Sequence, residues 1–120
     1  MIQPQNWEVV ADGAVAVPCE DWVAQGISAE RIDGFLPALP TAVFDLEGLG
    51  PHILMVMAQS QCDPRLAVRT LDGLWHFGEK ANGRQEIVVW SASDGPLQVW
   101  VGAGAQEQCD ATLTLETFDR

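Results

Sequence analysis

The stretch Leu97-Gln98-Val99-Trp100-Val101 decides the fold, because aliphatic side chains stand at every second position. Successive side chains of a β-strand point to opposite faces. The three aliphatic side chains therefore share one face, while Gln98 and Trp100 share the other. Residues 65–71 alternate in the same way. A period of two predicts strands that bury one face against a core.

Short β-type runs continue on both sides of this stretch, and turn residues separate them at the spacing of about 8–12 positions that is typical of a β-sandwich or barrel. The runs cover residues 41–46, 52–58, 65–71, 74–77, 86–90, 97–101 and 111–118. No helical pattern of the length needed to connect parallel neighbours lies between them, so the strands are predicted to be antiparallel. Unbroken apolar runs at 53–56 and 87–90 predict central strands that are covered on both faces.

Residues 1–40 differ from the rest, because Pro4, Pro18, Pro37 and Pro40 break them into short pieces. A first strand is predicted around Trp7, ahead of a turn at residues 12–13. One short helix is predicted to begin at Ser28, to bury an apolar face that includes Phe35 and Leu36, and to end before Pro37. The 120 residues fit one domain. We predict an all-β antiparallel sandwich of seven or eight strands over 41–118, with an irregular N-terminal segment packed on it.

The chain is acidic, with 17 Asp and Glu against 6 Lys and Arg and a formal net charge of −11. Nucleic acid and an anionic membrane surface would repel such a protein. Residues 1–59 contain eight acids but a single base, Arg31, so an acidic face is expected from this half. The longest apolar run, 53–58, is far shorter than the roughly 20 residues that span a bilayer.

Cys19, Cys62 and Cys109 are an odd number of cysteines, which leaves at least one thiol outside any intramolecular bridge. Each stands beside an acidic residue in a polar or turn-like stretch. We expect one disulfide, with Cys62–Cys109 favoured and a bridge from Cys19 to one of the other two as the alternative. A disulfide implies an exported protein, periplasmic or secreted, whereas three free thiols would imply a cytoplasmic one. The first residues lack the pattern of a signal peptide, which fits either a cytoplasmic protein or a signal that has been removed.

The sequence contains no pattern typical of a catalytic or metal site, so we expect no enzyme, no cofactor and no catalytic residues. His52 and His76 lie in apolar, strand-like stretches without zinc-ligand spacing. Calcium is the one metal that the acids near turns could bind, although no calcium-loop motif is present. Those acids are Asp63, Asp72, Glu79, Asp94 and Asp110.

The five tryptophans are expected mostly to fill the core or cover its edges. Two interpretations stay open for Trp100, which shares the outward side of its strand with Gln98: it packs against neighbouring strands, or it is exposed. An exposed Trp100, with Trp75 beside it, would provide a stacking platform for a sugar ring or a peptide. Trp75, Trp100 and Gln98 are therefore the candidate binding residues.

Residues 63–73 begin with Asp63-Pro64, alternate through Leu66 and Val68, and end in a turn at Asp72-Gly73. This segment resembles the bacterial pre-peptidase C-terminal (PPC-like) domain, and later runs follow that family's order over about residues 41–118. The resemblance implies a jelly-roll-like sandwich of exported bacterial proteins, which aids secretion or binding and has no catalytic residues. Departures are the segment 75–79 in place of an Asn/Asp-rich loop and the absence of tyrosines.

The function expected from these observations is that of an extracytoplasmic binding or accessory module with a protein or saccharide partner. An acidic inhibitor or immunity-type protein that binds a basic target is the alternative, because the net charge of −11 would steer such an association. A small hydrolase with dispersed carboxylates is the second alternative. The oligomeric state stays open.

Overall fold

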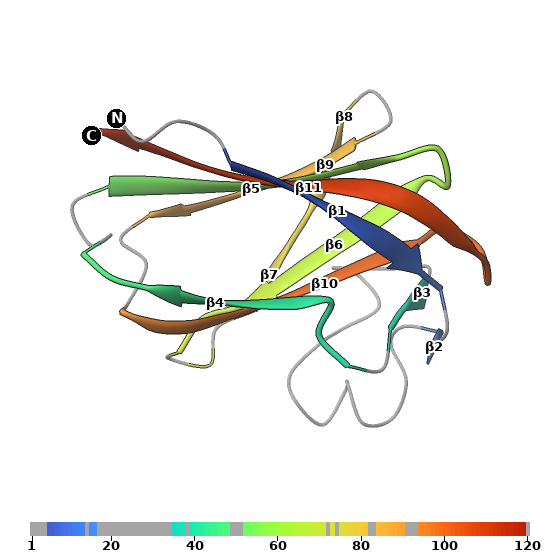
Figure 1. Cartoon of the computed structure of the whole chain (residues 1–120), viewed down its shortest axis with the longest axis horizontal. Helices are drawn as coiled ribbons and strands as arrows, with labels where there is room; N and C mark the ends of the chain where they lie inside the picture. Colours follow the sequence, from blue (N-terminus) through green and yellow to red (C-terminus); the bar gives the residue numbers. More distant parts are fainter. Residues whose placement is uncertain are drawn as a thin grey trace.

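The computed structural model describes residues 5–13, 15–16, 35–37, 39–48, 52–71, 73, 75–81, 84–90 and 94–119. These residues form two antiparallel sheets (Figure 1). Sheet A has the strand order β1 (Gln5–Asp12), β11 (Gln108–Asp119), β5 (His52–Ser60), β9 (Arg84–Trp90) and β8 (Glu79–Ala81). Sheet B has the order β2 (Val15–Ala16), β3 (Phe35–Leu36), β10 (Gly95–Ala103), β6 (Pro64–Arg69) and β7 (Trp75–Phe77), and β4 (Ala42–Leu46) also pairs with β10.

The two sheets share one hydrophobic core, to which each contributes every second residue of its strands. From β10 the three aliphatic side chains at 97, 99 and 101 are fully buried, as the period of two predicts. They pack with Leu54 and Val56 of β5 and with Leu113 of β11 from the opposite sheet. This common core is the arrangement expected of two face-to-face β-layers.

The described residues form more strands than the seven or eight predicted, because several additional strands are short. Seven strands have five or more residues, and β2, β3, β7 and β8 have two or three, which makes eleven among the described residues. β8 lies inside the segment 78–85, for which the sequence predicts a loop. It pairs with β9 in a hairpin and extends the edge of sheet A.

The predicted helix is wrong where the structure describes it. Phe35 and Leu36 form β3, which pairs with Ala103 of β10, while Ser28 and the rest of the predicted helix lie outside the described residues. Contact with β10 overrides the local helical pattern at this point. Gly102 permits the contact, because a side chain there would overlap the Phe35 carbonyl oxygen.

β5 is a central strand as predicted, between β11 and β9. β9 is not covered on both faces, however, since Val88 and Trp90 are exposed while Ile87 and Val89 are buried. An apolar run can thus have one open face. No helix long and apolar enough to cross a membrane occurs in the part of the chain that the structure describes.

Candidate binding face

The structure brings Trp75 and Trp100 together but buries both. Their ring centroids are 4.8 Å apart on the outer side of sheet B, where they pack with Leu36 and Ala67. Only 8% of Trp75 and 6% of Trp100 is accessible to solvent. The expectation of an exposed stacking platform at these two residues is therefore wrong, because neighbouring side chains such as Leu36 cover them.

Gln98 lies beside this aromatic cluster and is half-buried. Its neighbours across the sheet are Val43 of β4 and Arg69 of β6. The Arg69 guanidinium stands over the Trp75 ring at 5.5 Å from the centroid, which is within cation–π range. The protein's own side chains thus occupy the surface that was expected to stack against a sugar ring or a peptide.

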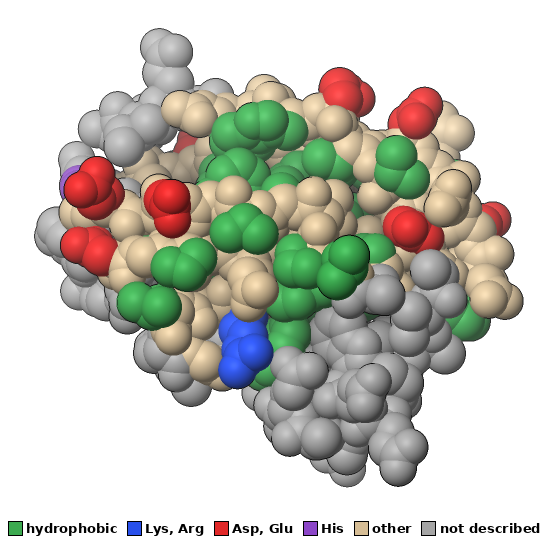
Figure 2. Space-filling model, turned by 60° about the horizontal axis from the view of Figure 1, so that its bottom comes forward, with side chains coloured by type: hydrophobic (Ala, Val, Ile, Leu, Met, Phe, Trp, Pro, Cys, Tyr) green, Lys and Arg blue, Asp and Glu red, His purple; other side chains and the backbone are tan. Residues whose placement is uncertain are grey.

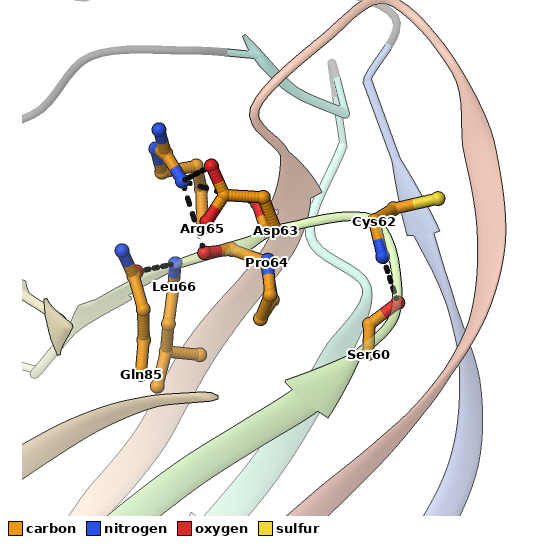
Figure 3. A network of polar contacts seen from close by, with 7 residues as sticks. All are labelled: Ser60, Cys62, Asp63, Pro64, Arg65, Leu66 and Gln85. Atoms are coloured by element: carbon orange, nitrogen blue, oxygen red, sulfur yellow. Dashed lines mark hydrogen bonds and ion pairs between the residues drawn. The ribbon is translucent and has the colours of Figure 1, made fainter. Parts of the chain in front are cut away.

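The predicted Cys62–Cys109 disulfide is present, and the two Cα atoms are 6.0 Å apart. The bridge joins the turn after β5 to the start of β11. Ser60 supports this turn, since its hydroxyl accepts a hydrogen bond from the Cys62 amide at 3.2 Å and donates one to the Asp110 carbonyl at 3.0 Å. Figure 3 shows Ser60 beneath the Cys62 amide. Cys19 lies outside the described residues.

The described acids among those suggested for calcium, Asp63, Asp94 and Asp110, do not gather into one group that could hold a metal. Asp63 pairs with Arg65 at 3.2 Å, and Asp94 accepts a hydrogen bond from the Gly48 amide at 2.9 Å. Asp72 and the side chain of Glu79 are not described. Within the described residues, the group of His, Cys, Asp or Glu side chains that lies close enough to hold a metal is Cys62, Glu107 and Cys109. Two of its three members are bonded to each other, so they are not free thiolate ligands.

The side of the molecule where β1 and β4 lie is apolar in the middle. We call this surface the β1–β4 face and define it by Trp7, Val10, Leu39, Val43 and Phe44, together with four acids described below. Leu39 is 76% accessible, and Val10 and Val43 are also exposed. Trp7 of β1 contacts Phe44 of β4 with ring centroids 4.8 Å apart, so this pair bridges the edges of the two sheets.

Four acids border this apolar middle: Glu8 and Asp12 on β1, Asp45 on β4 and Glu47 just after it. Strand alternation places Glu8 and Asp12 on the outer side of sheet A and Asp45 on the outer side of sheet B, so the acids border the middle from two sides. All four come from the first half of the chain, where the sequence predicts an acidic face. Figure 2 brings β4 forward and shows hydrophobic side chains across the middle of the surface, acidic side chains around them, and a basic patch at the lower edge of the apolar area. The tertiary structure thus combines exposed aliphatic groups with negative charge.

Two hollows open on the β1–β4 face. One, of about 600 Å³, lies between β1 and residues 37–41 and is lined by both aliphatic and acidic side chains. The other, of about 280 Å³, lies between β1, β4 and the end of β11, and includes Trp7, Phe44 and Asp45. No Lys or Arg lines either hollow among the described residues.

Sequence reasoning missed an exposed tryptophan, Trp90, which is 65% accessible. It lies on the outer side of sheet A with Val88, next to Ile53 of β5. A signal for this was present, because Arg84 and Glu86 occupy the same face of β9 as Trp90 and predict an outward side. A further hollow of about 850 Å³ extends from Glu8 and Val10 of the β1–β4 face toward the disulfide, and no aromatic ring occurs among its described lining residues.

Comparison with known proteins found no relative of this chain: no protein-family model matches it, and no curated protein matches it. The resemblance to the pre-peptidase C-terminal domain therefore stays a prediction.

Proposed function

We propose that this chain is a non-catalytic binding module whose partner is a basic protein, and that the β1–β4 face is its contact surface. One observation carries the proposal: exposed aliphatic side chains and four acids share this face, and no described Lys or Arg lines its hollows. An apolar centre with a charged rim is the usual anatomy of a protein interface. Its negative sign selects a positively charged partner and accelerates association with it.

The strand order supports a jelly-roll-like sandwich for this module. Eight strands, taken in chain order as β1, β4, β5, β6, β7, β9, β10 and β11, form the sheets first-eighth-third-sixth and second-seventh-fourth-fifth. Two such four-stranded sheets define a jelly roll. This fold serves many functions, so it supports a binding role only together with the face.

The Cys62–Cys109 disulfide supports an extracytoplasmic location, periplasmic or secreted, because such bonds persist in oxidising compartments. Within the proposed function, an accessory module and an acidic inhibitor or immunity-type protein differ only in the effect of binding on the partner. An inhibitor abolishes its partner's activity, and an accessory module does not. A saccharide partner has less support, since Trp75 and Trp100 are buried. A carboxylate-dependent hydrolase has less support, since Asp45, Glu47 and Glu116 are exposed or half-buried at the rim of a hollow.

Site-specific photo-crosslinking in the native host tests the proposal. A photoreactive phenylalanine analogue replaces Leu39 or Val43, whose exposed side chains lie on the face. The matched control places the analogue at Val88, an exposed aliphatic residue of β9 that lines none of the hollows next to the face. We expect one defined adduct from positions 39 and 43, weakened when salt is raised because the Debye length falls from about 10 Å at 0.1 M to about 3 Å at 1 M.

The identity of the crosslinked protein decides the outcome. A partner with a Lys- and Arg-rich segment at the crosslinked site supports the proposal, and its activity in the complex separates inhibitor from accessory module. An acidic partner, or adducts that are equally strong from position 88, would refute it.

A further inference from the structure

We infer that the smaller hollow of the β1–β4 face receives a single cationic side chain, arginine before lysine, from an extended segment of the basic partner. This inference rests on the proposed function and goes further, because it names the chemical group that is recognised and the residues that recognise it.

The size of the hollow suits one side chain. Its volume of about 280 Å³ is just below the range of about 300–1,000 Å³ that holds a drug-sized ligand, so a single side chain fits it better. It opens between β1, an edge of sheet A that pairs only with β11, and β4, which pairs only with β10 among the described residues. A segment running along these two edge strands can therefore insert a side chain between the sheets.

The inner wall of the hollow is apolar and aromatic. Leu46 and Leu54 are buried at its base, and the tilted Trp7–Phe44 pair forms its side. Such a wall can bury the methylene stem of a long side chain while the charged end stays near solvent. The faces of Trp and Phe rings also attract a cation, with Trp the strongest.

The rim of the hollow is acidic. Asp45 and Glu47 are exposed on the β4 side, and Glu116 lies half-buried on β11 opposite them. A guanidinium group presents donors in a planar fork that matches carboxylates and also stacks on aromatic rings, whereas an ammonium group is a point charge. A hollow lined by three acidic residues and two aromatic rings therefore favours arginine over lysine.

The same combination already occurs within this protein. Arg69 lies over Trp75 on the outer side of sheet B at 5.5 Å, so an arginine and an aromatic ring associate in this fold. Two other arginines are paired elsewhere, Arg65 with Asp63 at 3.2 Å and Arg84 with Glu86 at 3.1 Å. The described arginines thus lie away from the hollow.

The test uses the full chain with its disulfide intact and a blocked peptide, acetyl-Gly-Gly-Arg-Gly-Gly-amide. Amide chemical shifts are followed by NMR during titration. We expect shifts centred on the Trp7 indole N–H and on residues 44–47 and 115–117. The citrulline peptide has the same shape without the charge, and we expect it to bind at least about fivefold more weakly, since it loses both the cation–π and the charge-assisted contacts.

Variants with equal charge changes separate a specific site from general attraction. The double variant Asp45→Asn/Glu47→Gln should weaken arginine-peptide binding at least about fivefold, because it removes two charge-assisted partners. Glu107→Gln/Asp110→Asn changes the net charge equally but lies outside the hollow, so its effect should stay below about twofold. Phe44→Leu keeps an apolar side chain but removes the aromatic ring, so it should also weaken binding.

Equal binding of the two peptides, or equal effects of the two double variants, would overturn the inference. If that happens while photo-crosslinking at positions 39 and 43 still finds a basic partner, only the arginine site is wrong. If the arginine peptide binds as expected but no basic partner is crosslinked, the proposed function fails and the hollow remains a binding site for a cationic side chain.

Discussion

Gln85 shows how one buried polar residue joins the two sheets. The β6–β7 register would place Leu66 opposite Gly78. The Gly78 amide does donate to the Leu66 carbonyl at 2.8 Å, but the chain then leaves sheet B toward β8. The Gln85 side chain, on β9 of sheet A, accepts the hydrogen bond of the Leu66 amide at 2.6 Å (Figure 3). A side chain thus replaces the missing backbone acceptor.

Replacing Gln85 with Ala should lower the free energy of unfolding by about 1–3 kcal/mol, because the buried Leu66 amide would lose its acceptor. Urea unfolding measures the change. Gln59→Ala is the matched control, since Gln59 is an exposed glutamine on the outer side of sheet A, and surface substitutions usually change stability by less than about 0.5 kcal/mol. Equal stability of the two variants would show that the Gln85–Leu66 hydrogen bond contributes nothing.

At the scale of elements, the disulfide extends the pairing of β5 with β11. Their register pairs Ser60 with Ala111, and its continuation places Cys62 opposite Cys109 on the core side of sheet A. The bond therefore closes the end of the core where β5 turns into β6. It also joins residues 47 apart in the sequence, so it restricts a long loop of the unfolded chain.

Loss of this bond through Cys62→Ala/Cys109→Ala should lower the free energy of unfolding by up to about 4 kcal/mol, the value that loop-closure entropy gives for a loop of this length. Chemical denaturation of the variant and of the oxidised parent measures the difference. Cys19→Ala should leave the stability of the oxidised protein nearly unchanged. A large loss in Cys19→Ala instead would mean that Cys19 takes part in the bridge.

At the scale of the whole molecule, the outer sides of the two sheets differ. Sheet B is covered over Trp75 and Trp100, and sheet A leaves Trp90 and Val88 open to solvent. The β1–β4 face lies where edge strands of the two sheets meet, with Trp7 and Phe44 in contact across them. Which surfaces a partner can reach therefore depends on which parts of each sheet other side chains cover. The presence of aromatic residues in a strand does not decide it.

Acrylamide quenching of tryptophan fluorescence should report this asymmetry. Trp90→Phe should remove a readily quenched component, because 65% of Trp90 is accessible, and Trp100→Phe should remove a component that resists quenching. Both variants keep an aromatic side chain, so the fold is preserved. If Trp100→Phe instead removes the readily quenched component, the outer side of sheet B is open to solvent at Trp100.

Much of the fold was predictable because strand patterns are local. Residues 97–101 and 65–71 alternate, and they form parts of β10 and β6 with the expected side chains buried. The wrong predictions involve contacts between distant segments. Phe35 and Leu36 pair with β10 instead of ending a helix, and the outward side of Trp100 is covered although that of Trp90 is open.

The amino-acid pattern alone established an acidic, all-β domain and favoured one bridge among three cysteines, because alternation, charge and cysteine number do not depend on the path of the chain. The three-dimensional arrangement alone established that β1 and β4 meet along one side, since strands about 30 residues apart become neighbours only when both sheets close over a common core. That meeting turns separate acids and aromatic residues into one face, and no local pattern contains it.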